Sequence, residues 1–402
     1  MALSLDQVRI QDHDELYSEG QTIELTPHKA PKPWGWKWYP MPPDLTSDDI
    51  RQTDESKRIP RMQQVFQDKP HNLDLEIQKD AMRKMKVEVL EVLSVNNRSG
   101  SFIPGTQKIK CRVLEVPSVI SSADLQQTPV IGDVIFLKVY DALFWPHHVN
   151  SVNSYIRLTA RADMAMSDEV GAYQTLYNAG LTGPSSVAPQ WLGCWTAEVP
   201  TTDPSFQGQT RFVGVIALEF LDAICLKDLW VTKQFRKPIY LGDSSKLTKD
   251  GREIIEGQLD RATRLGTIED LLDGIVKQYK VNVTHEIIHP ENVLISLRGG
   301  GGSRNLTRPR VSLVGYKNSV VGSFREPPQD VFAKWPNPPH PFRRFNTQIL
   351  GHFLKYMDPK WKVNDPETVL AVDKWLLKTF GSLDGDKYTS FVCGEASPPI
   401  KL

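Results

Sequence analysis

Residues 281–319 constrain the fold more than any other stretch of this chain. The segment VNVTHEIIHPENVLI ends in an apolar run at Ile295, and a second apolar run, RVSLVGYKNS, begins at Arg310. Short runs rich in valine, isoleucine and leucine are typical of strands. The linker between them carries consecutive glycines from Gly299 to Gly302, which predict a hairpin connection and not a phosphate cradle, because a phosphate loop opens a helix. We therefore expect two paired strands preceded by a polar loop, HEIIHPEN.

That loop resembles the catalytic loop of the protein-kinase fold, whose pattern is H-R-D-x-x-x-x-N followed by an apolar strand. His285 and Asn292 fit the pattern, but the aspartate that orients or deprotonates the acceptor hydroxyl is replaced by Ile287. Where the family carries D-F-G to hold magnesium, this chain has Gly-Tyr-Lys at 315–317. The resemblance therefore implies a kinase-like fold in which ordinary phosphoryl transfer has been lost.

The same letters spell H-E-x-x-H from His285 to His289, a zinc-protease pattern that needs both histidines on one helical face. Two consecutive isoleucines and Pro290 disfavour a helix through this segment. The glycine and third histidine of the longer metzincin pattern do not follow. We expect both histidines to be loop residues and the chain to hold no metal. Stoichiometric zinc that disappears in a His289→Ala variant would contradict this expectation.

Three apolar runs before the loop predict antiparallel strands of a small lobe: MKVEVLEVLS, QKIKCRVLEV and DVIFLKVYD. Lys138 in the third run resembles the lysine of V-A-I-K, and Glu169 in SDEVGAYQTLYNAG resembles the glutamate of the family's helix αC. Asp168 and Glu169 are expected to begin that helix, where negative charge is favourable. The G-x-G-x-x-G signature is absent. Lys138 and Glu169 can hold a nucleotide's phosphates or form a structural ion pair, and we favour the ion pair.

The following segments match the family's order of elements. SVAPQWLGCWTAEV and RFVGVIALEFLDAICLKDLW predict strands that lead to a hinge, with a cleft beneath Leu218 and Glu219. TRLGTIEDLLDGIVKQYK, at 263–280, repeats apolar residues with a helical period and predicts a long core helix. Helices near 346–356 and 366–380 complete the chain, without the A-P-E segment of protein kinases. The resemblance extends from about 81 to 380, to a degenerate member of the fungal protein-kinase-like and aminoglycoside-kinase-like family.

The first seventy residues are polar and rich in proline and show no regular element. Their aromatic cluster, Trp34, Trp36, Trp38 and Tyr39, predicts an arm that lies across the folded body, as a structural extension or as a lid or partner surface. Lys plus Arg and Asp plus Glu number 48 each in 402 residues, so no net charge attracts nucleic acid or an anionic membrane. We expect a soluble, cytoplasmic protein, because no secretory signal or membrane-spanning run is evident.

These patterns predict an α+β, two-lobed protein-kinase-like fold with an irregular extension at 1–80, a small antiparallel β-rich N-lobe at 81–218 and a larger helical C-lobe at 219–402. The predicted function is a pseudokinase that binds a small molecule in the inter-lobe cleft or a protein partner, with no cofactor beyond residual ATP binding. The expected pocket residues are Lys138, Glu169, Leu218, Glu219, Ile287, Asn292 and Gly315.

The alternative function is an enzyme that uses the same pocket without a metal. It would isomerise an apolar metabolite of a fungal biosynthetic pathway, or cyclise it by a pericyclic reaction. Shape would hold a reactive conformer, and Tyr316, Lys317 or His285 would polarise a carbonyl.

Overall fold

The computed structural model describes residues 17–35, 38–53, 55–68, 70–71, 84–93, 105–117, 129–145, 155–201, 203–232, 238–240, 259–298, 305–383 and 385–389. The chain forms two compact units, one from residues 1–174 and 190–220 and the other from 175–189 and 221–402. The predicted boundary at 218/219 grouped 175–189 with the first lobe, whereas these residues pack within the second unit. The predicted glycine-rich connection at 299–302 lies outside the described residues.

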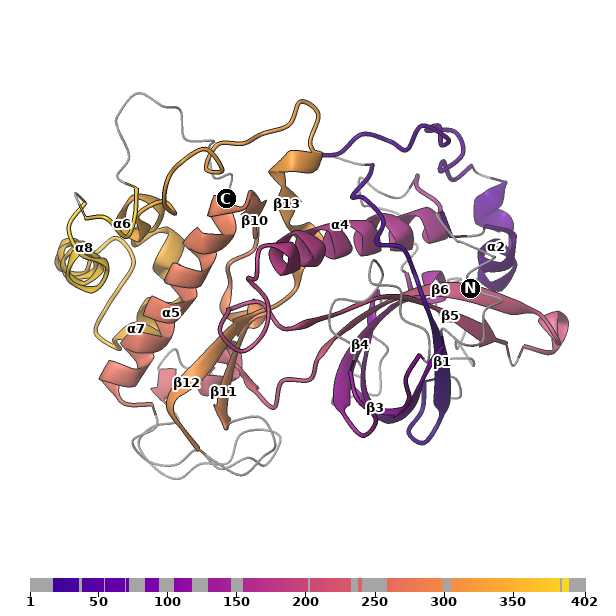
Figure 1. Ribbon diagram of the computed structural model, residues 1–402, viewed down its shortest axis with the longest axis horizontal. Coiled ribbons are helices and arrows are strands. Elements are labelled where there is room, and N and C mark those ends of the chain that lie inside the picture. The colour runs from indigo at the N-terminus through magenta and orange to yellow at the C-terminus, as the bar shows by residue number, and fades with distance from the viewer. Residues whose placement is uncertain are drawn as a thin grey trace, which may run out of the picture. The chain divides into compact units, whose positions relative to one another are not determined.

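A closed antiparallel barrel forms the centre of the first unit, in the strand order β1-β2-β3-β4-β6-β5 (Figure 1). Its strands are β1 (Thr22–Pro27), β2 (Met85–Val92), β3 (Gln107–Glu115), β4 (Val134–Tyr140), β5 (Trp191–Pro200) and β6 (Thr210–Glu219). Residues of β2 and β3 alternate between buried and more exposed positions, and the apolar side chains at the buried positions fill the barrel interior. The strands predicted from the three apolar runs are therefore confirmed, and they pair antiparallel.

The N-terminal extension is more regular than the sequence predicted. It contains β1 and the helix α2 (Arg61–Gln67). β1 closes the barrel because it pairs with two strands: Leu25 lies opposite Met85 of β2, and Thr26 lies opposite Thr196 of β5. The prediction of an irregular extension was wrong at these residues. A six-residue strand that ends in proline has a weak local signal and depends on its two partners.

The helix α4 (Leu158–Asn178) begins ten residues earlier than Asp168. Asp168 and Glu169 therefore lie in the middle of the helix, and the prediction that they begin it was wrong. The first turns of α4 carry apolar residues that pack against the N-terminal arm, in a core cluster of Trp34, Ile156, Ala160 and Met164. The burial of Trp34 agrees with an arm that lies across the body of its own unit.

The second unit combines helices with short antiparallel sheets. Its helices are α5 (Arg261–Lys280), α6 (Pro341–Arg344), α7 (Leu354–Met357) and α8 (Pro366–Phe380). Its strands are β7 (Ile224–Cys225), β8 (Trp230–Thr232), β9 (Pro238–Tyr240), β10 (Val283–Thr284), β11 (Val293–Arg298), β12 (Asn305–Leu313) and β13 (Val320–Val321). The sheet order β12-β11-β7 confirms the pairing of the two strands predicted around 281–319, although β12 begins at Asn305 and not at Arg310.

The long helix predicted at 263–280 is confirmed as α5, which runs beside β12 (Figure 1). Asp260 caps its N-terminus by accepting a hydrogen bond from the backbone N–H of Thr263 at 2.7 Å. Its predicted apolar stripe is buried from Ile268 to Val276. Within the described residues, no helix is both long enough and apolar enough to cross a bilayer.

Candidate functional site

The first group of predicted site residues lies where β4 meets α4 in the first unit. Lys138 of β4 forms an ion pair with Glu169 of α4, and the Tyr140 hydroxyl donates a hydrogen bond to the same carboxylate oxygen. The Lys138 and Glu169 side chains are only 8% and 0% exposed. Burial, together with the Glu169 carboxylate, raises the pKa of Tyr140 well above its ordinary value. The structure thus brings Lys138 and Glu169 together and adds Tyr140, which the sequence reasoning missed.

Leu218 and Glu219 lie at the end of β6 in the same unit. Leu218 is buried and is paired in the sheet with Phe136 and Trp191. Glu219 is fixed to Gln190 from two sides: its carboxylate accepts the Gln190 N–H at 2.7 Å, and its own N–H donates to the Gln190 carbonyl at 3.0 Å. Both residues therefore shape the end of the strand.

The second group of predicted residues forms a loop cluster in the second unit. His285 donates from Nε2 to the Val314 carbonyl at 3.1 Å, and its ring lies edge-on to Tyr316 with centroids 4.8 Å apart. Asn292 donates from Nδ2 to the Ile287 carbonyl at 3.0 Å. The backbone N–H of Val314 donates to the Asn292 carbonyl at 2.8 Å, which ties the loop to the segment after β12. His285, Ile287, Asn292 and Tyr316 are therefore neighbours, as the pattern predicted.

Gly315 completes this loop cluster and is confined to glycine by its backbone. Its φ is +86°, in the left-handed region, and a Cβ placed on it would lie 3.0 Å from Oδ1 of Asn292. An aspartate here would combine a strained backbone with a carboxylate close to an amide oxygen. The loop is thus shaped against a metal-holding carboxylate at 315.

Replacing Gly315 with alanine is expected to lower the free energy of unfolding by about 1–3 kcal/mol. The cost of a left-handed backbone at alanine adds to the cost of the close contact between its Cβ and Asn292. Gly20 has a similar φ of +84° but no neighbouring atom within 4 Å, so Gly20→Ala is the matched control. Urea denaturation should show a larger loss for Gly315→Ala than for Gly20→Ala. Equal losses would mean that the Asn292 contact contributes nothing.

The three donors of the alternative enzyme hypothesis do not share one surface. Tyr316 is fully buried, and its hydroxyl accepts a hydrogen bond from Nε2 of Gln278 at 2.7 Å. His285 is also buried. Lys317 is exposed, and Ile287 is 43% exposed. Substrate polarisation by Tyr316, His285 and Lys317 together therefore gains no support from their positions.

The zinc-protease geometry is contradicted by the backbone between His285 and His289. The segment is not helical, and His289 is extended, with φ −134° and ψ 148°. His289 instead caps the 3-10 helix η7 (Pro290–Asn292), accepting the Glu291 N–H at 3.4 Å, and its ring lies 4.4 Å from that of His352. Among the described residues, no three His, Cys, Asp or Glu side chains gather as metal ligands.

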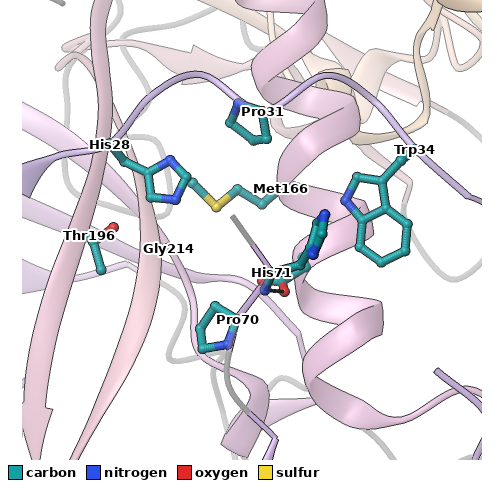
Figure 2. Close-up of a pocket in the computed structure, with 9 residues that line it drawn as sticks. His28, Pro31, Trp34, Pro70, His71, Met166, Thr196 and Gly214 are labelled. Atoms are coloured by element: carbon teal, nitrogen blue, oxygen red, sulfur yellow. Dashed lines mark hydrogen bonds between the residues drawn. The ribbon is translucent and has the colours of Figure 1, made fainter. Parts of the chain in front are cut away.

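The sequence reasoning also missed a small cavity in the first unit, next to the N-terminal arm (Figure 2). Its volume of about 10 Å³ is enough for one water molecule and not for a ligand. It is lined by His28, Pro31, Trp34, Pro70, His71, Asp163, Met166, Thr196 and Gly214. The backbone N–H of His71 donates to Asp163 at 2.6 Å, which ties the arm to α4.

Asp163 and Asp168 on α4 are expected to make stability fall as pH rises. Burial raises the pKa of each carboxyl from 3.8 to about 8. Below pH 4 both folded and unfolded carboxyls are protonated and the stability is complete; between about pH 4 and 8 only the unfolded state releases the proton, so stability is lost. Asp168→Asn should therefore raise the unfolding free energy at pH 8 by an amount on the order of 2 kcal/mol and flatten its pH dependence.

Chemical denaturation at pH 5, 6.5 and 8 measures this effect, with Asp373→Asn in the middle of α8 as the control. A pH slope that Asp163→Asn and Asp168→Asn both leave unchanged would show that these carboxyls ionise normally in the folded protein.

Comparison with known proteins gives little further information. No protein-family model matches the chain, and no curated protein does. Among solved structures, the chain is similar to one described as WaaP in complex with acyl carrier protein, at 14% identity and a TM-score of 0.27, covering 70% of this chain and 87% of that one. A similarity of this size carries no argument about activity, so function has to be inferred from the chain's own residues.

Proposed function

We propose that this chain is a catalytically degraded kinase-like protein, which binds a ligand or a protein partner and does not perform ordinary phosphoryl transfer. The observation that carries the proposal is the loop cluster of His285, Ile287, Asn292 and Gly315. Its hydrogen bonds support a loop of the kinase-like type. Ile287 and Gly315, however, stand at the two positions where that type has an aspartate.

Phosphoryl transfer depends on magnesium held by carboxylates and on a base that orients the acceptor hydroxyl. Ile287 offers only a hydrocarbon side chain at the position of the base. Gly315 has no side chain, and a Cβ there would lie 3.0 Å from Oδ1 of Asn292. The Nδ2 of Asn292 donates to the Ile287 carbonyl, and its Oδ1, the atom that binds metal in the family pattern, has no carboxylate at 287 or 315 to share a metal with. The cluster is therefore suited to keeping the loop in shape and poorly suited to holding metal.

The ion pair of Lys138 and Glu169 supports the same proposal from the first unit. Its burial and its third partner, Tyr140, indicate a group that stabilises the fold whether or not a nucleotide is present. Residual ATP binding remains compatible with a lysine at this position. Without carboxylates at 287 and 315, we expect any such binding to be independent of magnesium.

The test combines a thermal-shift titration with a phosphoryl-transfer assay. ATP is titrated with magnesium and with EDTA, since a ligand that binds only the folded state raises the Tm. We expect equal shifts under both conditions and no transfer from ATP to peptide, aminoglycoside or sugar acceptors. If no shift occurs, a screen of apolar metabolites by the same method identifies the ligand class.

Two variants make the result decisive. Ile287→Asp restores one carboxylate at an exposed position and should stay inactive, because the second carboxylate is still missing. Asn292→Ala is the control that shows whether any phosphoryl transfer measured with the wild type comes from this protein. Magnesium-dependent transfer by the wild type that disappears in Asn292→Ala would overturn the proposal, whereas transfer that persists in Asn292→Ala would come from a contaminant.

A further inference from the structure

We propose that a groove in the second unit binds a small neutral molecule with an amide group, such as a carboxamide, a lactam or a urea. The groove has a volume of about 500 Å³, within the range of known small-molecule sites. It is lined by the loop at 180–187, by α5 between Asp270 and Gln278, and by β12 between Arg308 and Val311. These segments belong to one unit, and the groove uses neither the Lys138–Glu169 ion pair nor Ile287, Asn292 and Gly315, so the inference does not depend on the function proposed above.

Gln278 lines the groove and carries a hydrogen-bond acceptor that no described residue satisfies. Its side chain is 1% exposed, and its Nε2 donates to the hydroxyl of Tyr316. Within the described residues its Oε1 has no hydrogen-bond partner. A buried polar atom without a partner costs about 1–3 kcal/mol. A ligand N–H that reaches Oε1 recovers this cost, which gives the groove a preference for a donor.

Val311 supplies a donor. β12 is the edge strand of its sheet, and Leu313 donates its N–H to the Val187 carbonyl at 2.7 Å, away from β11. Alternate residues of an antiparallel strand direct their backbone groups to the same side, so the N–H of Val311 also points away from β11. Pro309, on that same side, has no N–H and interrupts the row of donors. The edge therefore suits a single acceptor group better than an extended peptide.

Among the described residues, five charged side chains line the groove, and four of them, all except Arg310, form two ion pairs that a neutral ligand leaves undisturbed. Arg308 donates to Asp270 at 2.7 Å, and Lys277 lies 2.7 Å from Asp273. A charged ligand has to compete with these ion pairs, whereas a neutral one leaves them intact. An amide group carries both an N–H, which an acceptor such as Gln278 Oε1 requires, and a C=O, which a donor such as the Val311 N–H requires, and the proposal names this class for that reason.

Gln278 also links the groove to the loop cluster. Its Nε2 donates a hydrogen bond to the Tyr316 hydroxyl, and the Tyr316 ring packs against His285. A ligand that orders Gln278 should slow backbone hydrogen exchange at 314–318 as well as at 184–187. This second effect distinguishes binding in the groove from binding elsewhere.

The test is a titration of the full chain with acetamide, nicotinamide and ethyleneurea, followed by saturation-transfer NMR and calorimetry. Ser185 is an exposed residue of the groove wall, and Ser185→Trp should block the groove without entering the core. Ser323→Trp, at an exposed residue outside the groove, is the matched control. We expect at least one probe to bind with a Kd below about 10 mM, weakened tenfold or more in Ser185→Trp and unchanged in Ser323→Trp.

Further arms test the amide chemistry. Gln278→Met should weaken binding about tenfold, the equivalent of one lost hydrogen bond. Acetate has the size of acetamide but carries a charge, and it should bind more weakly. Failure of all three amide probes to bind, equal binding by the two tryptophan variants, or a preference for acetate would each overturn the proposal. The Ser185→Trp comparison remains valid even if Gln278→Met does not fold.

Discussion

Arg211→Met is expected to lower the free energy of unfolding by about 3–5 kcal/mol, because it leaves a buried carboxylate without its cation. Arg211 of β6 donates to both oxygens of Asp141, at 2.7 and 3.2 Å, and both side chains are buried. The Tyr17 hydroxyl and the Leu143 N–H also donate to Asp141, at 2.9 and 3.0 Å. These neutral donors remain in the variant but do not neutralise the charge.

Arg112→Met is the control for this prediction. Arg112 lies on β3, its side chain is 52% exposed, and it is 3.6 Å from Glu88. A pair in water contributes about 0–1 kcal/mol, so its loss should be small. Urea denaturation of both variants measures the difference. Similar losses for Arg211→Met and Arg112→Met would show that Asp141 is solvated or neutral in the folded protein, contrary to the burial described above.

The sequence predicted the elements whose signals are local. β2 and β3 have alternating apolar residues, β4 is a short and almost continuous apolar run, and α5 has an apolar stripe with helical period, so each could be located from its own residues. β1 and the first ten residues of α4 have weak signals of their own. β1 depends on pairing with β2 and β5, and the first turns of α4 depend on the arm around Trp34. Long-range partners of this kind cannot be read from spacing.

The candidate site shows the same division. A motif pattern was enough to pair Lys138 with Glu169 and to place His285 near Asn292. It could not show that Tyr140 shares the Glu169 carboxylate, because that depends on the angle at which α4 meets β4. Nor could it show that Tyr316 is buried against Gln278, or that the groove along β12 exists. Burial and cavities arise from three-dimensional packing, and a sequence pattern identifies only residue types in order.

Lys138→Met is expected to have the second large effect on stability, again a loss of about 3–5 kcal/mol. The variant keeps the Glu169 carboxylate, which is fully buried, and retains only the neutral Tyr140 hydroxyl as its donor among the partners described above. Lys86→Met is the control, because the Lys86 side chain is 38% exposed and lies 3.8 Å from Glu115. Its loss should be at most about 1 kcal/mol.

A double-mutant cycle of Lys138 and Glu169 distinguishes a structural role of the lysine from a role in nucleotide binding. If the pair is structural, Glu169→Gln in the Lys138→Met background should recover about half or more of the lost stability, because the uncompensated charge is removed, and the coupling energy should be about 2 kcal/mol. If Lys138 serves a nucleotide alone, Lys138→Met should instead be as stable as the wild type and lose any thermal shift with ATP. A structural result would mean that the fold itself explains why the lysine and glutamate persist beside a loop with Ile287 and Gly315. Their presence would then be no evidence for phosphate chemistry.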